Sequence, residues 1–252
     1  MEKYYTVNSD GCSIRSKLYY NDLSDIRKVV LCGHGFSGHK DNKAAEKFAK
    51  HVLSKNKGCG VITFDLPCHG EDVRKALRLE DCSKYFSVMT EYIRSAFSSP
   101  ELFAYMTSFS GYLILRYILE AGERFSKIAL RCPAVDMYGV MQRTVISDDD
   151  RKLLSKNKPV LAGFDRKVRI DKVFLDSLRE ESIAERDFSA FASDIFILHG
   201  TKDEVVPIDS VKAFADKNGI DFEAVEDADH RFSKPDKMDY AVELITALFD
   251  LK

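Results

Sequence analysis

The sequence predicts an α/β protein with a mostly parallel, twisted sheet and helices on both of its faces. Short apolar runs, such as residues 28–33 and 127–131, are bounded by glycine or polar residues, as buried parallel strands usually are. Between such runs lie segments whose apolar residues recur every three or four positions, the period of an amphipathic helix. The alternation breaks after Pro133 and returns at residue 194, which indicates a helical insertion within one large domain.

The first half of the chain supplies a hairpin and then strand–helix repeats. Loose alternation with a turn at residues 8–11 predicts an antiparallel hairpin at a sheet edge. The strand at residues 28–33 precedes a helix whose apolar face runs over residues 44–53. A strand at residues 61–64 then precedes a helix over residues 85–96. Such repeats build a parallel sheet, because each helix carries the chain back to the same edge.

The second half continues the repeats on both sides of the insertion. An apolar run over residues 102–107 ends at Ser108, and a helix is expected over residues 112–121. The next strand is expected at residues 127–131. After the insertion we expect a strand at residues 194–200, a helix over 210–217, a strand at 222–225 and a final amphipathic helix over 238–249.

We therefore divide the chain into a core, residues 1–133 and 187–252, and an insertion, residues 134–186. The insertion is rich in charged residues and shows no convincing strand pattern. Ser147, which three aspartates follow, is a candidate N-cap of one short helix, and apolar residues within 173–183 suggest a second. We expect these helices to lie over the strand ends where sites of α/β proteins form.

Ser108 marks the candidate site. A serine at a corner between a strand and a helix presents its hydroxyl out of the backbone, where a base can reach it. Asp203 follows the strand at residues 194–200, and His230 is the one histidine beyond Asp203. Ser108, Asp203 and His230 therefore form a candidate catalytic triad. Asp136, after the preceding strand, is an alternative acid, because triads are defined by geometry rather than by position.

These segments resemble the α/β-hydrolase family, whose nucleophile, acid and histidine follow one another in this order. Residues 34–38 (His-Gly-Phe-Ser-Gly) are similar to the family's oxyanion loop. Residues 64–70 are similar to its Asp-x-Pro-Gly-His-Gly stretch, with Cys68 in place of a glycine. The matching segments span residues 28–232, so the resemblance implies the α/β-hydrolase fold for most of the chain.

The resemblance also implies a role for each site residue. Ser108 would be the nucleophile, His230 the base, and Asp203 the acid that orients the imidazole. The backbone N–H groups of Phe36 and Phe109 would form the oxyanion hole. The implied activity is a serine esterase that cleaves carboxylic esters through an acyl-enzyme, without a cofactor or metal. A peptidase, a thioesterase or a lactonase would use the same triad, so these activities stay open.

The serine motif departs from the family's Gly-x-Ser-x-Gly, because Met106 and Ser110 occupy the two glycine positions. Small residues relieve crowding around a strained serine, so the neighbouring strand must leave room for Met106. Ser110 is the poorer nucleophile candidate, since Tyr112 would then occupy the crowded position. The departure motivates a second hypothesis, a binding module that kept the fold and lost catalysis.

The loop at residues 35–40 and the length of the insertion look most similar to bacterial cinnamoyl/feruloyl-type esterases and monoacylglycerol-lipase-like hydrolases. The resemblance implies that residues 134–186 form a lid whose apolar side chains contact the substrate. The candidates for these contacts are Met141, Phe164 and Phe174.

Four further polar residues lie in the matching loops. His34 and His69 are expected to orient their loops through hydrogen bonds. His39 and Lys40 are expected at the surface, near the mouth of the site.

Composition bears on partners and location. A net charge of −2 provides no global field for nucleic acid or an anionic membrane. We see no signal peptide and no apolar run near the ~20 residues of a membrane span. The six cysteines form no Cys-x-x-Cys pair and are expected to be reduced, with Cys32 and Cys132 in the core. The sequence thus predicts a cytoplasmic protein with a small-molecule ester substrate, and leaves its oligomeric state open.

Overall fold

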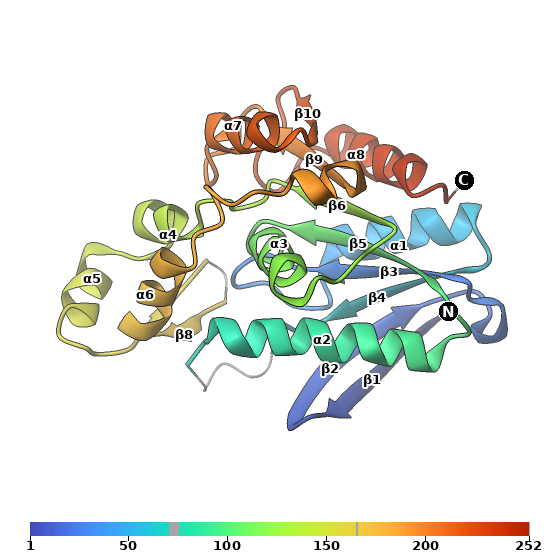
Figure 1. The fold of residues 1–252 in the computed structure, drawn as a ribbon, viewed down its shortest axis with the longest axis horizontal. Coiled ribbons are helices and arrows are strands. Elements are labelled where there is room, and N and C mark those ends of the chain that lie inside the picture. The colour runs from blue at the N-terminus through green and yellow to red at the C-terminus, as the bar shows by residue number, and fades with distance from the viewer. Residues whose placement is uncertain (71–75, 165, 252) are drawn as a thin grey trace.

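The computed structural model describes residues 1–70, 76–164 and 166–251. Within these ranges an eight-stranded sheet has the strand order β1-β2-β4-β3-β5-β6-β9-β10 (Figure 1). Its strands are β1 (Glu2–Ser9), β2 (Cys12–Tyr19), β3 (Lys28–Gly33), β4 (Cys59–Phe64), β5 (Glu101–Thr107), β6 (Lys127–Arg131), β9 (Ile195–Gly200) and β10 (Asp221–Val225). The β1–β2 hairpin lies at one edge and β2 pairs antiparallel to β4, whereas the neighbours from β4 onward pair in parallel. The predicted fold class is confirmed.

Helices cover both faces of the sheet. Those outside the insertion are α1 (Lys43–Lys55), α2 (Leu79–Ala96), α3 (Phe109–Ala121), α7 (Ile208–Asn218) and α8 (Pro235–Leu248), with short 3-10 turns at Leu23–Asp25 and Ser189–Asp194. Phe86 of α2 and Ile114 of α3 belong to one buried apolar cluster. Phe48 of α1 and Ile245 of α8 belong to a second. Two cores, one on each face, therefore hold the carboxyl ends of the parallel strands in fixed positions.

The insertion contains strands as well as helices. Its elements are α4 (Met137–Val140), a π-helical turn (Met141–Val145), α5 (Asp148–Leu154), β7 (Val160–Ala162), β8 (Val168–Ile170) and α6 (Lys172–Glu180). Ser147 caps α5 in a capping box, as its position before three aspartates predicts. Figure 1 shows α4, α5 and α6 grouped beside the end of the sheet.

The expectation that residues 134–186 lack strands was wrong. Strands β7 and β8 form an antiparallel pair apart from the main sheet. Each has three residues, with its two end residues buried and its middle residue exposed. An alternation this short does not stand out from a charged, helix-rich sequence, because strand periodicity needs more positions to be distinguished.

Candidate active site

Ser108 is the single residue between β5 and α3, and its backbone is strained, with φ 52° and ψ −114°. Its N–H donates to the carbonyl of Arg131 at 3.0 Å, and its own carbonyl accepts the N–H groups of Gly111 and Ala134. Such backbone strain costs ~1–3 kcal/mol and persists only where the surroundings fix it. These bonds therefore hold the Ser108 side chain at the carboxyl end of β5.

Met106 fits beside this corner because Gly33 lies opposite it, on β3. A Cβ on residue 33 would lie 2.4 Å from Met106 Sδ and 2.6 Å from Ser110 Cβ. The neighbouring strand β3 thus leaves the space that the side chain of Met106 needs, as the sequence predicts. Ser110 is fully buried, and its hydroxyl donates to the carbonyl of Thr107 and accepts that residue's N–H, both at 2.9 Å. Ser110 therefore stabilises the backbone turn at Thr107 and Ser108 through these two hydrogen bonds.

Ser108, His230 and Asp203 come together although three separate elements carry them. His230 Nε2 lies 3.1 Å from Ser108 Oγ, and His230 Nδ1 lies 2.8 Å from Asp203 Oδ2. The imidazole thus bridges the hydroxyl and the carboxylate. This is the geometry in which an imidazole can take a proton from a serine while an acid fixes its tautomer.

Two neighbouring loops carry the acid and the histidine. Asp203 lies in the loop after β9, and His230 lies in the loop between β10 and α8. The N–H of Lys202 donates to the carbonyl of Ala228 at 2.9 Å, and the N–H of His230 donates to Glu204 Oε2 at 3.3 Å. These two bonds join the loops, so the separation of Asp203 from His230 is fixed by backbone as well as by side chains.

The carboxyl group of Asp203 is fully buried and ionised. Its Oδ1 accepts the N–H groups of Val205 and Val206, each at 2.8 Å. Burial alone would raise the pKa of Asp203, but hydrogen bonds from His199 and His230 hold it well below its usual value. The acid therefore keeps its negative charge at any pH at which the protein is expected to work.

Asp136, the alternative acid, is occupied elsewhere. It caps α4 by accepting the N–H of Gly139 at 2.9 Å, and it pairs with Arg143 at 3.3 Å. Among the two candidates, Asp203 is the one that contacts His230.

The loop at residues 34–38 passes directly beside Ser108. A Cβ on Gly35 would lie 3.3 Å from Ser108 Cβ, and the rings of Phe36 and Phe109 meet edge to face at 5.5 Å. Within the described part of the chain, neither the Phe36 nor the Phe109 backbone N–H donates to a protein acceptor. Both N–H groups are therefore free of protein acceptors, as the donors of an oxyanion hole must be.

His34, which belongs to this loop, and His69, whose ring packs against that of Phe36 at 5.4 Å, are both buried. Leu66 N–H donates to His34 Nε2 at 3.1 Å, so the proton of His34 resides on Nδ1, which donates to the carbonyl of Gly35 at 2.8 Å. His69 Nδ1 lies 2.8 Å from the carbonyl of Pro67. Burial lowers the pKa of His34 to about 4 and that of His69 to about 3, so both are neutral.

The expected surface position of Lys40 was wrong, whereas His39 is only half-buried. Lys40 is buried, its backbone N–H donates to Asp65 Oδ1 at 2.7 Å, and its ammonium lies 3.3 Å from Asp65 Oδ2. The carboxylate that follows β4 therefore draws this lysine inward, and charge alone could not predict it.

Besides Ala134, whose N–H bonds the carbonyl of Ser108, the insertion reaches the neighbourhood of the serine through Phe174 and Phe164. The ring of Phe174, fully buried on α6, meets the ring of Phe109 edge to face at 6.4 Å. The backbone N–H of Phe164 donates to Ser37 Oγ at 3.2 Å, and its side chain is 37% exposed. Met141 is fully buried within the core cluster. Two of the three predicted contact residues thus contact segments beside Ser108, Phe174 at the start of α3 and Phe164 at the loop of residues 34–38.

Cys132 was expected to be only a small core residue, and it is buried. Its sulfur lies within 4.8 Å of ligand atoms of Asp203 and His230, the one such group of three in the described part of the chain. Sequence reasoning missed this contact, because Cys132 follows β6 and nothing in its neighbours points to the acid of another loop.

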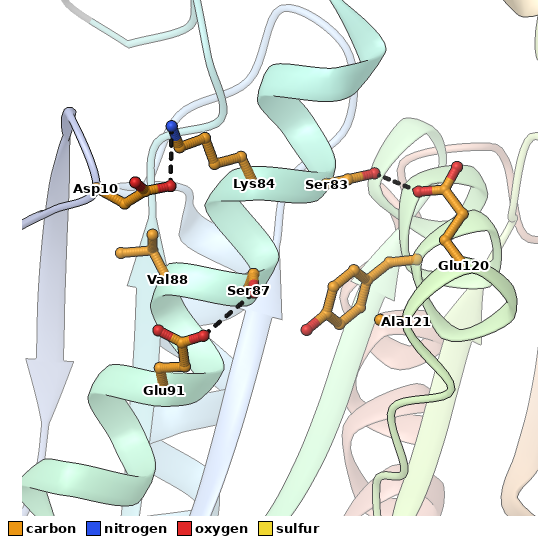
Figure 2. Close-up of a pocket in the computed structure, with 9 residues that line it drawn as sticks. Asp10, Ser83, Lys84, Ser87, Val88, Glu91, Glu120 and Ala121 are labelled. Atoms are coloured by element: carbon orange, nitrogen blue, oxygen red, sulfur yellow. Dashed lines mark hydrogen bonds and ion pairs between the residues drawn. The ribbon is translucent and has the colours of Figure 1, made fainter.

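A pocket of about 400 Å³ lies near the C-terminal end of α3, the opposite end from Ser108. Figure 2 shows its polar side chains paired with one another, Lys84 with Asp10 and Ser83 with Glu120. These pairs leave the pocket without an evident chemical function.

Comparison with known proteins rests on structure alone. No protein-family model and no curated protein sequence matches the chain. Est1E from Butyrivibrio proteoclasticus, also solved with ferulic acid bound, has a TM-score of 0.75 at 14% identity, over 97% of this chain and 96% of its own. A putative hydrolase from Agrobacterium vitis has a TM-score of 0.73 at 18% identity, over 99% and 98%.

A monoacylglycerol lipase from Paleococcus ferrophilus is also similar, with a TM-score of 0.66 at 17% identity over 95% of this chain and 99% of its own. In the described residues, no helix combines the length and apolarity needed to span a membrane. The sheet order, the serine corner and these neighbours agree: the chain has the α/β-hydrolase fold.

Proposed function

We propose that this protein is a serine hydrolase that cleaves carboxylic esters through an acyl-enzyme. The observation that carries the proposal is the imidazole of His230, which lies 3.1 Å from Ser108 Oγ and 2.8 Å from Asp203 Oδ2. A serine hydroxyl is a poor nucleophile at neutral pH unless a base takes its proton as it attacks. This arrangement supplies the base and the acid that orients it.

In the proposed acylation step, Ser108 Oγ attacks the carbonyl carbon of the ester while its proton passes to His230 Nε2. The carbonyl oxygen becomes an oxyanion, which accepts hydrogen bonds from the backbone N–H groups of Phe36 and Phe109. Collapse of the intermediate breaks the bond to the alkoxide oxygen, which leaves with the proton from His230.

Deacylation repeats these steps with water. His230 takes a proton from water as the water oxygen attacks the acyl carbon, and the acid product leaves as Ser108 regains its proton. Asp203 stabilises the imidazolium in both steps and stays ionised. The chain's own residues supply every group in this scheme, so we propose no cofactor or metal.

We propose that residues 134–186 act as a lid that selects the substrate. Phe164 is the most accessible candidate, because its side chain is 37% exposed while its N–H is anchored to Ser37. Phe174 would act through Phe109, against which it packs. The ester class itself is favoured by the neighbours, which include an esterase domain from Rhodothermus marinus and the lipase described above.

The main competing hypothesis, a binding module without catalysis, arose from Met106. Since Gly33 accommodates Met106, that residue gives no reason to expect a distorted serine. Peptidase, thioesterase and lactonase activities use the same attack and differ in the leaving group, so they are alternatives that a substrate panel separates.

A fluorophosphonate probe tests the proposal directly, since it labels only an activated serine. We expect stoichiometric labelling of the wild-type protein and none of Ser108→Ala. Hydrolysis of aryl, acyl and hydroxycinnamoyl esters, beside a peptide, a thioester and a lactone, then identifies the substrate class. An unlabelled wild-type protein that hydrolyses none of these compounds would favour the binding module.

A further inference from the structure

Asp203 is contacted by a second imidazole, that of His199, in addition to that of His230. His199 lies on β9, one residue before its end, and its side chain is fully buried. Its Nε2 lies 3.1 Å from Asp203 Oδ2 and 3.0 Å from the carbonyl oxygen of Val206. The same carboxylate oxygen therefore faces two histidines, one on the serine side and one behind it.

The contacts of His199 define its tautomer. Both neighbours of Nε2, Asp203 Oδ2 and the carbonyl of Val206, are acceptors, so the ring proton resides on Nε2. Among the described residues, Nδ1 is buried without a hydrogen-bond partner. The ring also stacks on Phe222, with centroids 6.4 Å apart. Within the described part of the chain, His199 thus makes its polar contacts through Nε2, as a donor.

Both carboxylate oxygens of Asp203 are contacted by N–H donors. Two backbone N–H groups bind Oδ1, and two imidazoles contact Oδ2. Cys132 also lies close to this carboxylate, and Glu204 accepts the backbone N–H of His230. With Oδ1 held by backbone N–H groups, the direction of Oδ2 depends on the two imidazoles that contact it, those of His199 and His230.

We propose that His199 is a positioning residue that holds Asp203 Oδ2 toward His230 through its Nε2–H, which it shares between that oxygen and the carbonyl of Val206. The inference rests on the proposed hydrolase function and adds a fourth side chain to its machinery. His199 reaches the serine only through Asp203 and His230, so its removal should change the turnover of bound substrate rather than substrate binding.

Removing the Nε2–H has two expected consequences. The carboxylate is less firmly oriented, so kcat should fall about tenfold or more, the equivalent of one hydrogen bond to a charged group. With one hydrogen-bond donor fewer, the carboxylate of Asp203 stabilises the protonated form of His230 more strongly than in the wild type. The acid limb of the kcat/KM profile should therefore move to higher pH, while KM changes by less than about twofold.

The test compares four variants of the full chain. His199→Phe keeps a ring on Phe222 and removes the donor, and His199→Met removes it with an unbranched side chain. His199→Gln retains an N–H near the position of Nε2 and should restore both kcat and the acid limb. Phe222→Leu removes the stacking partner but leaves His199, and should keep the wild-type pH profile.

Fluorophosphonate labelling of each variant gives the fraction of active protein, to which kcat is normalised. Lower kcat with a shifted acid limb in His199→Phe or His199→Met, and recovery in His199→Gln, supports the proposal. Wild-type kcat and pH profile in either donor-free variant overturns it, as does an equal loss in the glutamine variant with no shift. Failure of the wild-type protein to react with the probe would instead overturn the proposed function.

Discussion

The carbonyl oxygen of Ala228 lies against Gly200, so close that a Cβ on residue 200 would be 2.2 Å from it. Gly200 ends β9, three residues before Asp203, and Ala228 lies two residues before His230. The contact therefore sets how closely the loops that carry the acid and the histidine approach each other.

Changing Gly200 to Ala should separate these loops. Crowding of this kind typically destabilises a protein by ~1–3 kcal/mol, and a displacement of ~1 Å at the site can cost ~10²-fold in rate. Urea unfolding and kcat/KM measure the two effects. Gly58→Ala is the matched control, since its Cβ would lie 3.2 Å from its nearest neighbour, far from the triad. Equal effects of both changes would contradict this account.

Ser108→Ala should fold normally and lose essentially all esterase activity, measured with a p-nitrophenyl ester. Ser110→Ala should keep much of its activity. It should lose ~1–3 kcal/mol of stability, because the part-buried N–H and carbonyl of Thr107 each lose their contact with its hydroxyl. Strong activity in Ser108→Ala would refute the nucleophile assignment.

The two acids should differ sharply. Asp203→Asn removes the charge that stabilises the imidazolium and favours the wrong tautomer, so kcat should fall by roughly 10⁴-fold, as in serine proteases. Asp136→Asn should retain near wild-type kcat, because its contacts are with Gly139 and Arg143. Circular dichroism checks that both variants are folded. A large loss in Asp136→Asn alone would transfer the acid role to that residue.

Stability should decline in mild acid because of His34 and His69. Burial lowers the pKa of His34 from 6.5 to about 4 and that of His69 to about 3. Below pH ~6.5 the unfolded chain binds protons that the folded chain excludes, so stability falls as pH drops toward those values, by ~1.4 kcal/mol per pH unit per histidine. Urea unfolding between pH 7 and pH 4 measures the slope.

His69→Phe provides the check on this slope, because it removes one of the two histidines whose pKa burial lowers and retains a ring against Phe109. The variant should show a shallower dependence on pH than the wild type. An unchanged slope would mean that His69 takes up a proton in the folded state.

Phe164 should influence which ester is preferred. One missing apolar contact changes discrimination between substrates by ~1–3 kcal/mol, so Phe164→Ala should alter relative kcat/KM between bulky and acetyl esters. Leu153→Ala removes a similarly exposed apolar side chain from α5 and should leave the ratio unchanged. If the two variants behave alike, the insertion has no role in selection at Phe164.

The sequence predicted the main sheet and the residues that meet at the serine, because both depend on local patterns. Apolar runs bounded by turn residues mark buried strands, and Ser108, Asp203 and His230 each follow such a run. Parallel strands bring their carboxyl ends to one edge, so chain order implied that Ser108 and His230 meet there with an acid, either Asp203 or the alternative Asp136.

The parts that sequence reasoning missed depend on contacts between distant segments. His199 lies four residues before Asp203 in the sequence, but only the fold shows that its ring contacts the carboxylate. The contact of Cys132 with Asp203 and His230 was missed, and the burial of Lys40 was mispredicted, for the same reason: their partners lie in loops that follow other strands. The β7–β8 pair was too short for its alternation to register.

Because Gly33 has no side chain, it leaves the volume that Met106 occupies beside the serine corner. This affects how such proteins are recognised from their sequences. The familiar signature assigns the small residues to positions flanking the serine, yet the geometry requires only empty volume there, from whichever strand provides it. A pattern written along one stretch of chain cannot record that substitution. A chain can therefore lose both flanking glycines, preserve the corner, and pass unnoticed through a search that looks for them.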